Sequence, residues 1–222
     1  MYWFDQGGSF TMKKKVLTER QLKSQQVKEN IHNAAIRMLK EYEYDYLTVR
    51  NVCKEANVST GTFYHHFKNK DDLLTYYLAY GYEKYMDENE ILFDDDVKKN
   101  IAQIYHIYIS YCMEMGIEFL SNYYSTKNKS LNTRDKHSPD EIHKVPFFEK
   151  SIIAIKHGQE QEFISPDVDI HEAANDICTL VKGLIFEWCL TDGSYDLQKN
   201  VQKILRIYLN SIVTEAYRAL YE

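Results

Sequence analysis

The chain has 222 residues with a formal net charge of −6, and 44% of its residues are hydrophobic. That share is enough for a sizeable core, so a chain that is disordered throughout is excluded. Only 8 Gly and 3 Pro are spread over this length, which is too few turn-forming residues for a β protein. We expect an all-α fold.

The negative net charge is unevenly distributed along the chain. Residues 13–70 carry 12 Lys and Arg against 6 Asp and Glu, whereas residues 71–222 carry 15 against 26. A basic amino-terminal third can be attracted to phosphate groups while the acidic remainder is repelled by them. The net charge alone therefore does not exclude nucleic-acid binding.

Several other classes of protein are disfavoured by what the sequence lacks. The four cysteines, Cys53, Cys112, Cys178 and Cys189, have no paired spacing, so neither a zinc site nor a disulfide framework is predicted. The eight histidines form no HExxH or other compact ligand set. No apolar run reaches the roughly 20 residues that span a bilayer. We expect a cytoplasmic protein with no metal, no cofactor and no membrane partner.

The first residues stand apart from the helical pattern that follows them. Met12 precedes Lys13, Lys14 and Lys15 and is itself a possible natural start. We therefore expect residues 1–15 to be flexible or an addition to the natural chain.

Three helices are predicted in the basic third. The first spans Gln21 to Glu41, because apolar residues recur there at intervals of three and four. Thr48 and Ser59 can each cap a short helix, since a hydroxyl accepts N–H bonds at a helix start. Asn57 lies between these two helices and tolerates the left-handed backbone that ends a helix tightly. The two short helices should therefore meet at a sharp angle.

Longer helices are predicted in the acidic part. One starts at Asn69, and another starts at Asp94–Asp96 and carries an apolar stripe as far as Phe119. This second helix is apolar on nearly every face, so we expect it to run through the middle of a domain. Asn122 to Pro139 is polar and is predicted to be an exposed connection. Further helices are predicted at Pro146–Glu160, from Asp169 to Trp188, and from Leu197 to Leu220.

The segment from Leu47 to Leu74, LTVRNVCKEANVSTGTFYHHFKNKDDLL, closely resembles the signature of the TetR family. The shared features are Thr48, Ala56, Val58-Ser59, Thr62-Phe63-Tyr64, His66-Phe67, Lys70 and Leu73-Leu74. Asn57 stands where the family usually has Gly, and asparagine can take the same backbone shape. The resemblance implies an amino-terminal three-helix helix-turn-helix DNA-binding domain, residues 16–68. It also implies a larger helical bundle for ligand sensing and dimerisation, residues 69–222.

A helix-turn-helix lays its second helix in the major groove, with the start of that helix against base edges. The exposed candidates there are Thr60, Gly61, Thr62, Tyr64 and His65. Gly61 permits close approach, and the two threonines offer hydroxyls and methyls to base edges. Contacts with phosphates are expected from Tyr64 and His66, and from a backbone clamp of Thr48, Arg50 and Lys70.

The predicted reading helix lacks basic side chains. No Lys or Arg lies between Glu55 and Lys68, so bidentate readout of guanine from this helix is not expected. Base recognition should instead depend on hydroxyls, thymine methyls, His65, bridging water and DNA shape.

Aromatic residues in the acidic part have two explanations. Their helical spacing is typical of ordinary core packing, but 19 tyrosines also make a polar-tipped ligand cavity possible. The candidate pocket residues are Tyr105, Tyr108, Cys112, Met115, Phe119, Phe147 and Trp188.

The resemblance also implies a homodimer that packs its last two helices, Asp169–Trp188 and Leu197–Leu220, against the partner's. Two-fold symmetry would then match a palindromic operator on double-stranded DNA. The leading interpretation is a ligand-responsive transcriptional repressor with a small-molecule effector. The alternatives are an activator, a regulator switched by a protein partner at the acidic carboxy-terminal surface, and an enzyme built on a helical bundle.

Overall fold

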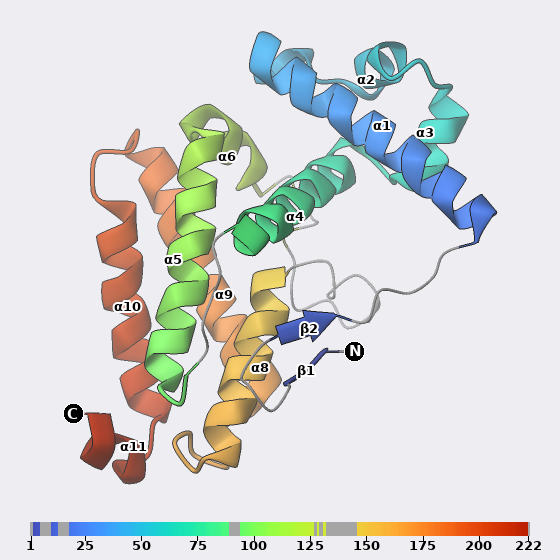
Figure 1. Ribbon diagram of the computed structural model, residues 1–222. Helices are drawn as coiled ribbons and strands as arrows, with labels where there is room; N and C mark the ends of the chain where they lie inside the picture. The colour runs from blue at the N-terminus through green and yellow to red at the C-terminus, as the bar shows by residue number, and fades with distance from the viewer. Residues whose placement is uncertain are drawn as a thin grey trace. The chain divides into compact units, whose positions relative to one another are not determined.

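The computed structural model describes residues 2–4, 10–12, 18–88, 94–126, 128, 131 and 146–221. Its helices are α1 (Glu19–Glu41), the 3-10 helix η1 (Tyr44–Tyr46), α2 (Val49–Glu55), α3 (Thr60–His66), α4 (Lys70–Glu88), α5 (Val97–Met115), α6 (Ile117–Tyr123), α8 (Pro146–Glu160), α9 (Ile170–Leu190), α10 (Leu197–Ile212) and α11 (Glu215–Tyr221) (Figure 1). Helices dominate the described residues, so the expected all-α class is confirmed.

One short hairpin was not expected from the sequence. Strands β1 (Tyr2–Phe4) and β2 (Phe10–Met12) pair antiparallel, with Trp3 opposite Thr11. The hairpin lies within residues 1–15, and the origin of that segment stays a prediction.

The chain divides into two compact units, and the boundary between them along the chain falls within α4. Unit 1 contains the chain up to Tyr80, and unit 2 contains most of the chain from Gly81 onward. The domain boundary expected between residues 68 and 69 falls just before α4. The assignment of a separate function to each side of that boundary stays a prediction.

The helix ends of unit 1 follow the predicted caps. Thr48 accepts the N–H of Asn51 at 3.2 Å, and Ser59 accepts that of Thr62 at 3.0 Å. Asn57 has φ 53°, and its N–H donates to Lys54 O at 3.2 Å. The next N–H, that of Val58, donates to the carbonyl of Cys53 at 3.0 Å. These two bonds form a Schellman motif, which satisfies the end of α2 and turns the chain into α3.

Unit 1 buries the apolar stripe of α1 against α2, α3 and the start of α4. The buried apolar residues include Ile31, Ala34, Ala35, Met38, Leu47, Val52, Cys53, Ala56, Phe63, Phe67, Leu73 and Leu74. Asn30 donates from Nδ2 to the carbonyl of Ala56 at 2.9 Å, which ties α1 to the turn between the short helices. The angle between α2 and α3 is thus held both by the core and by a polar bond.

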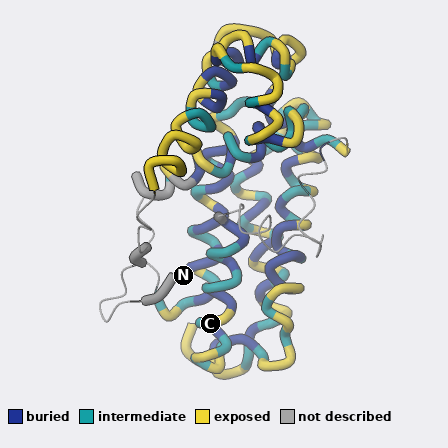
Figure 2. Tube along the Cα trace, turned by 90° about the vertical axis from the view of Figure 1, so that its right-hand side faces the viewer, coloured by how far each residue is buried: buried dark blue, intermediate teal, exposed yellow. Residues whose placement is uncertain are grey.

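In unit 2, α5 packs against α8 and α10, and α9 packs against α6, α8 and α10. Figure 2 shows buried residues along the long helices and exposed residues at the turns that join them. Along α5, buried positions include Ile101, Ile104, Tyr105, Tyr108, Ile109, Tyr111 and Cys112. The expectation that this helix runs through the middle of a domain is therefore confirmed.

The prediction that one helix extends from Asp96 to Phe119 is wrong. Gly116 has φ 82°, and this left-handed backbone ends α5 at Met115. Phe119 consequently belongs to the separate helix α6. Glycine adopts this conformation without the steric cost that a side chain would add, so a single residue divides the stripe.

The last predicted helix is also divided. At the end of α10 the backbone bonds to a distant segment instead of continuing the helix. The carbonyl of Ile212 accepts the N–H of Ser165 at 3.1 Å, and the N–H of Thr214 donates to the carbonyl of Phe163 at 3.0 Å. Ile164 and Val213 form an isolated antiparallel bridge between these segments. This long-range pairing ends α10 at Ile212, so Leu220 lies on α11.

Several other expectations concern what the chain lacks. Cys53, Cys112 and Cys178 are buried and Cys189 is half-buried, all four as free thiols. Among the described residues, no three His, Cys, Asp or Glu side chains gather as a metal site, and no helix is long and apolar enough to cross a membrane. Most of the predicted polar connection from Asn122 to Pro139 lies outside the described residues.

Candidate DNA-binding surface

Helix α3 buries one side and exposes the other. Phe63 is fully buried, and its ring centroid lies 5.6 Å from that of Phe67 at the end of the helix. On the opposite side, four of the predicted DNA contacts are exposed: Thr60, Gly61, Tyr64 and His65. Tyr64 is 57% exposed and rests edge-on against Phe63. The helix is thus fixed by its aromatic side and presents a polar side to solvent.

Thr62 is less available than its neighbours. It is half-buried, and its hydroxyl lies 2.9 Å from the Ser59 hydroxyl that caps the helix. Its side chain is therefore engaged in holding the start of α3. We infer that Thr62 positions the helix more than it contacts a base edge.

The predicted backbone clamp is spread over two helix starts. Thr48 and Arg50 are exposed at the start of α2. Lys70 is half-buried at the start of α4, with Nζ 4.2 Å from the centre of the Tyr44 ring. The α4 start is capped by Asn69, whose Oδ1 accepts the N–H of Asp72 at 2.8 Å. These bonds and the aromatic contact restrain Lys70, so less side-chain freedom would be lost on binding a phosphate.

His66 is half-buried beside His65, with ring centroids 5.0 Å apart. Burial lowers the pKa of His66 below 6.5, and the nearby charges of His65 and Lys28 lower it further. A neutral imidazole can donate one N–H to a phosphate oxygen but brings no full positive charge. His66 therefore suits a hydrogen bond to the DNA backbone.

Lys28 was missed by the sequence reasoning. On α1 it places Nζ 3.8 Å from the centre of the Tyr76 ring and 5.5 Å from that of Phe67, at the end of α3. The helical pattern placed this lysine off the apolar stripe of α1. No pattern within one helix could reveal that it meets two aromatic rings from other helices.

A buried histidine on α1 gives unit 1 an expected pH dependence. His32 is 2% exposed between the rings of Tyr76, Tyr77 and Tyr80, and its Nε2 has no hydrogen-bond partner among the described residues. Burial lowers its pKa below 6.5, although Asn33 and Glu29 partly oppose the shift. The unfolded chain therefore binds this proton at higher pH than the folded chain, and folding stability falls as pH drops below about 6.5.

We expect the free energy of unfolding to decrease between pH 7.5 and pH 5.5, and to decrease less in His32→Leu. Urea unfolding followed by far-UV circular dichroism would measure this difference. His66→Leu should remove a smaller part of the pH dependence, because His66 is only half-buried. An unchanged pH dependence in His32→Leu would show that the buried imidazole is not its source.

The structure gathers most of the predicted pocket residues in the core of unit 2. Tyr105, Tyr108, Cys112, Phe119 and Phe147 are buried, and Met115 is half-buried. Four rings form a continuous aromatic cluster, which we define as Tyr82, Tyr105, Tyr108 and Phe147. Trp188 is held elsewhere, because its Nε1 donates to the carbonyl of Tyr195 at 3.0 Å.

The polar tips of the aromatic cluster have partners inside the core. The Tyr105 hydroxyl lies 3.2 Å from Ser151 Oγ and 3.4 Å from Cys178 Sγ, and the Tyr108 hydroxyl bonds to that of Tyr124. Burial raises the pKa of Tyr105 and Tyr108 and raises that of Cys178 to about 11. All three groups are therefore neutral at physiological pH. The ligand pocket expected at these residues stays a prediction.

Two short helices around a tight turn, with the second exposed on one side, define a helix-turn-helix DNA-binding protein. Comparisons with known proteins agree. Residues 31–77 match the family model of the bacterial regulatory proteins, tetR family. The HTH-type transcriptional regulator YwcC of Bacillus subtilis, itself uncharacterised, is 26% identical over 180 aligned positions, which cover 74% of this chain and 77% of the relative.

Solved structures share the fold. FadR of Thermus thermophilus, a TetR family transcriptional repressor in complex with lauroyl-CoA, matches 85% of this chain and 96% of its own with TM-score 0.58 and 17% identity. FadR of Bacillus subtilis in complex with stearoyl-CoA matches 83% of this chain and 98% of its own with TM-score 0.51 and 20% identity. Residues 31–77 are therefore similar to the DNA-binding segment of the tetR family, and the fold of the chain is shared with solved TetR-family regulators.

Proposed function

We propose that the chain is a homodimeric repressor that reads a palindromic operator with α3 and is released by a small-molecule effector. The observation that carries this proposal is the exposed side of α3, which combines Thr60, Gly61, Tyr64 and His65 on a helix fixed from behind by Phe63. In the proposal, Thr60, Gly61 and His65 meet base edges. Tyr64, His66, Thr48, Arg50 and Lys70 meet the phosphate backbone.

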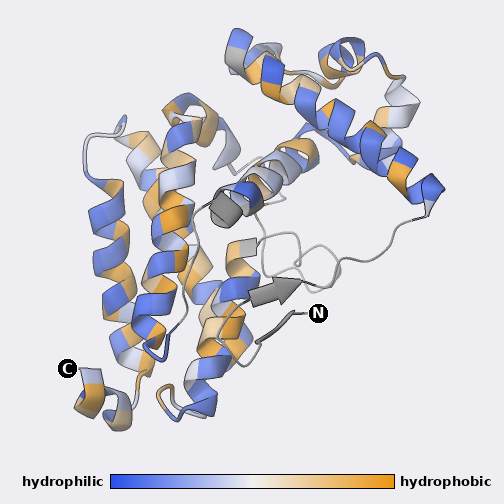
Figure 3. Cartoon of the chain, viewed as in Figure 1, coloured by the Kyte–Doolittle hydropathy of each residue, from blue (hydrophilic) through white to orange (hydrophobic). Residues whose placement is uncertain are grey.

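Exposed apolar residues on α9 and α10 support the homodimer. Phe186 and Leu190 on α9 are 42% and 63% exposed, and Ile207 on α10 is 57% exposed. Figure 3 shows hydrophilic and hydrophobic residues side by side along α10. Large apolar side chains left exposed on these two helices are available for burial against a partner. A two-fold dimer formed there would present two α3 helices to two half-sites of one operator.

The aromatic cluster in unit 2 supports a site for the effector. Its rings and hydroxyls suit a mainly apolar ligand with a few polar contacts. The acyl-CoA complexes of the two FadR proteins support an apolar chain as part of such a ligand. Helix α4 continues from unit 1 into unit 2, so an effector that favours one α4 position can shift the population of DNA-binding dimers.

The decisive experiment is selection of bound DNA across the genome of the source organism, with the purified full chain at moderate salt. The expected result is one enriched palindrome that overlaps promoters, since a repressor competes with transcription there. The genes next to it would indicate the chemical class of the effector. If no palindrome is enriched, the proposal that a homodimer binds a palindromic operator is overturned.

Two variants should affect DNA binding differently. Tyr64→Ala should weaken binding to all sequences, because a phosphate contact carries no base information. Thr60→Ala should change the preferred sequence, because a base-edge contact discriminates between bases. Selection from random DNA with each purified variant measures both effects. A Thr60→Ala sequence preference identical to that of the natural chain would contradict the assigned role.

A further inference from the structure

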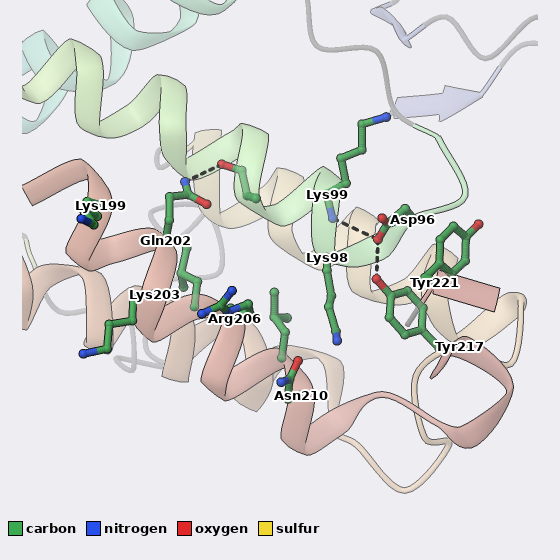
Figure 4. Close-up of a pocket in the computed structure, with 13 residues that line it drawn as sticks. Asp96, Lys98, Lys99, Lys199, Gln202, Lys203, Arg206, Asn210, Tyr217 and Tyr221 are labelled. Atoms are coloured by element: carbon green, nitrogen blue, oxygen red, sulfur yellow. Dashed lines mark hydrogen bonds between the residues drawn. The ribbon is translucent and has the colours of Figure 1, made fainter. Parts of the chain in front are cut away.

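A groove in unit 2 lies between the start of α5, α10 and α11 (Figure 4). Its volume is about 730 Å³, within the range of small-molecule sites. The residues that line it include Asp96, Lys98, Lys99, Lys199, Gln202, Lys203, Arg206, Asn210, Tyr217 and Tyr221. Since the buried aromatic cluster contributes none of these residues, the groove is a separate candidate site.

Positive charge is concentrated in the groove. Five Lys and Arg residues line it, against Asp96 as the one carboxylate among its lining residues. Residues 71–222 as a whole carry 15 Lys and Arg against 26 Asp and Glu. A cluster of cations on an otherwise acidic unit creates a local positive potential, which attracts anions.

The single carboxylate is already engaged in holding the groove together. Asp96 Oδ1 accepts the backbone N–H of Lys99 at 3.1 Å, which caps α5. The same oxygen accepts the Tyr217 hydroxyl at 2.6 Å and so ties α11 to the start of α5. Through this oxygen Asp96 helps to fix the shape of the groove, and the five cations exceed its single negative charge by four.

The cations are arranged in two groups. Lys99 pairs with Asp94 and extends away from the groove in Figure 4. Lys199, Lys203 and Arg206 have no ion-pair partner among the described residues. Lys98 reaches from α5 toward the α10 side and lies with Nζ 4.8 Å from the centre of the Tyr217 ring. Four cations can therefore face one bound anion.

Next to the cations is a flat aromatic surface. The rings of Tyr217 and Tyr221 stack with centroids 4.8 Å apart and planes inclined by 25°. Phe163 meets both rings edge-on at 5.9 and 5.7 Å, which fixes the pair from the side. Tyr221 is 41% exposed, so part of its surface is available to a ligand.

We propose that this groove binds a nucleoside di- or triphosphate. Arginine and lysine bind phosphate oxygens, with Arg206 able to form two parallel hydrogen bonds. A planar base can stack on the exposed ring of Tyr221 while the phosphates lie between Lys98 and α10. Two or three phosphates balance the four cations, whereas a single carboxylate would leave most of that charge uncompensated.

The groove and the proposed dimer surface use neighbouring parts of α10. Successive residues of a helix are turned by about 100°, so Arg206 and Ile207 point in different directions on α10. Arg206 lines the groove, while Ile207 belongs to the exposed apolar face. Lys203 also lines the groove and lies four residues before Ile207, about 40° from it around the helix, so the groove borders the proposed dimer surface.

Isothermal titration calorimetry of the full chain with ATP, inorganic triphosphate and adenosine tests the proposal. We expect ATP to bind, triphosphate to bind about fivefold more weakly because it cannot stack, and adenosine to show no detectable binding. Arg206→Ala combined with Lys203→Ala should weaken ATP binding at least tenfold. Both side chains are exposed, so the fold should be retained, and far-UV circular dichroism checks this.

Two matched controls make the result specific. Lys156→Ala removes an exposed lysine on α8 that pairs with Glu160, outside the groove, and should change ATP affinity less than twofold. Tyr221→Ala should abolish the preference for ATP over triphosphate, and Tyr221→Phe should retain it because the ring remains.

Three outcomes would overturn the proposal. The first is no ATP binding by the natural chain at millimolar ATP, and the second is an equal loss of affinity in Lys156→Ala. The third is a loss of non-specific duplex DNA binding in the groove variant as large as its loss of ATP binding, which would assign the groove to DNA phosphates. Because ATP has no acyl chain, none of these outcomes decides whether the aromatic cluster binds an effector.

Discussion

Gly61→Ala should make α3 slightly more stable and yet weaken operator binding at least tenfold. An added Cβ would meet only Ser59 Oγ, at 3.6 Å, so the folded chain has room for it. Alanine in a helix is favoured over glycine by up to about 1 kcal/mol. The same methyl would project from the exposed side of α3, where a base edge is expected to approach. A gain in stability together with a loss of affinity separates a DNA contact from a fold defect.

Both quantities can be measured on one preparation. Urea unfolding gives the stability change, and fluorescence anisotropy with the selected operator gives the affinity. Gly61→Ser is the matched variant, because it adds a similar volume together with a hydroxyl that can hydrogen-bond. If excluded volume causes the loss, serine should weaken binding about as much as alanine. Unchanged operator affinity in Gly61→Ala would show that the DNA does not approach the chain closely at this residue.

Unit 1 could be predicted closely because its signals are local. The caps at Thr48 and Ser59 and the left-handed turn at Asn57 each depend on a few neighbouring residues, and the structure confirms all three. The spacing of apolar residues in α1 likewise predicts which of its residues are buried. The exposure of each α3 residue follows from the same periodicity, except for Thr62. The Thr62 hydroxyl bonds to the Ser59 hydroxyl. The spacing of residues along the helix does not predict whether such a hydroxyl binds a neighbouring side chain or DNA.

Unit 2 was less predictable because its helix ends depend on distant segments. The local signal near Val213 is Thr214, whose hydroxyl accepts the N–H of Tyr217 at 3.3 Å at the start of α11, and α10 ends where residues 163–165 pair with Ile212 to Thr214 across the fold. Gly116 was a local signal that the strong apolar periodicity on both sides concealed. The basic groove has a similar origin, because its cations come from two helices about 100 residues apart in the chain. Within either helix alone, Lys98 or Lys203 looks like an ordinary solvated charge.

Gly81→Ala should destabilise unit 2 by about 1–3 kcal/mol, although alanine favours helices, because it overfills a packed site. A Cβ at this position of α4 would clash with Tyr111 Oη and would lie 2.8 Å from its Cζ. Tyr111 is 5% exposed, and its ring also contacts those of Tyr82 and Tyr85. The ring therefore has little room to move away. Urea unfolding, with hydrogen exchange of α5 to locate the effect, measures the loss.

Gly61→Ala is the matched control, since it makes the same change in a helix with open space and should be stabilising. Tyr111→Phe removes the closest clashing atom, so Gly81→Ala should cost less in that background, and a double-mutant cycle isolates this coupling. Equal costs in both backgrounds would place the strain elsewhere. A stabilised Gly81→Ala would mean that Tyr111 shifts freely. Either outcome would show that α4 can approach α5 this closely even when the residue at position 81 has a side chain.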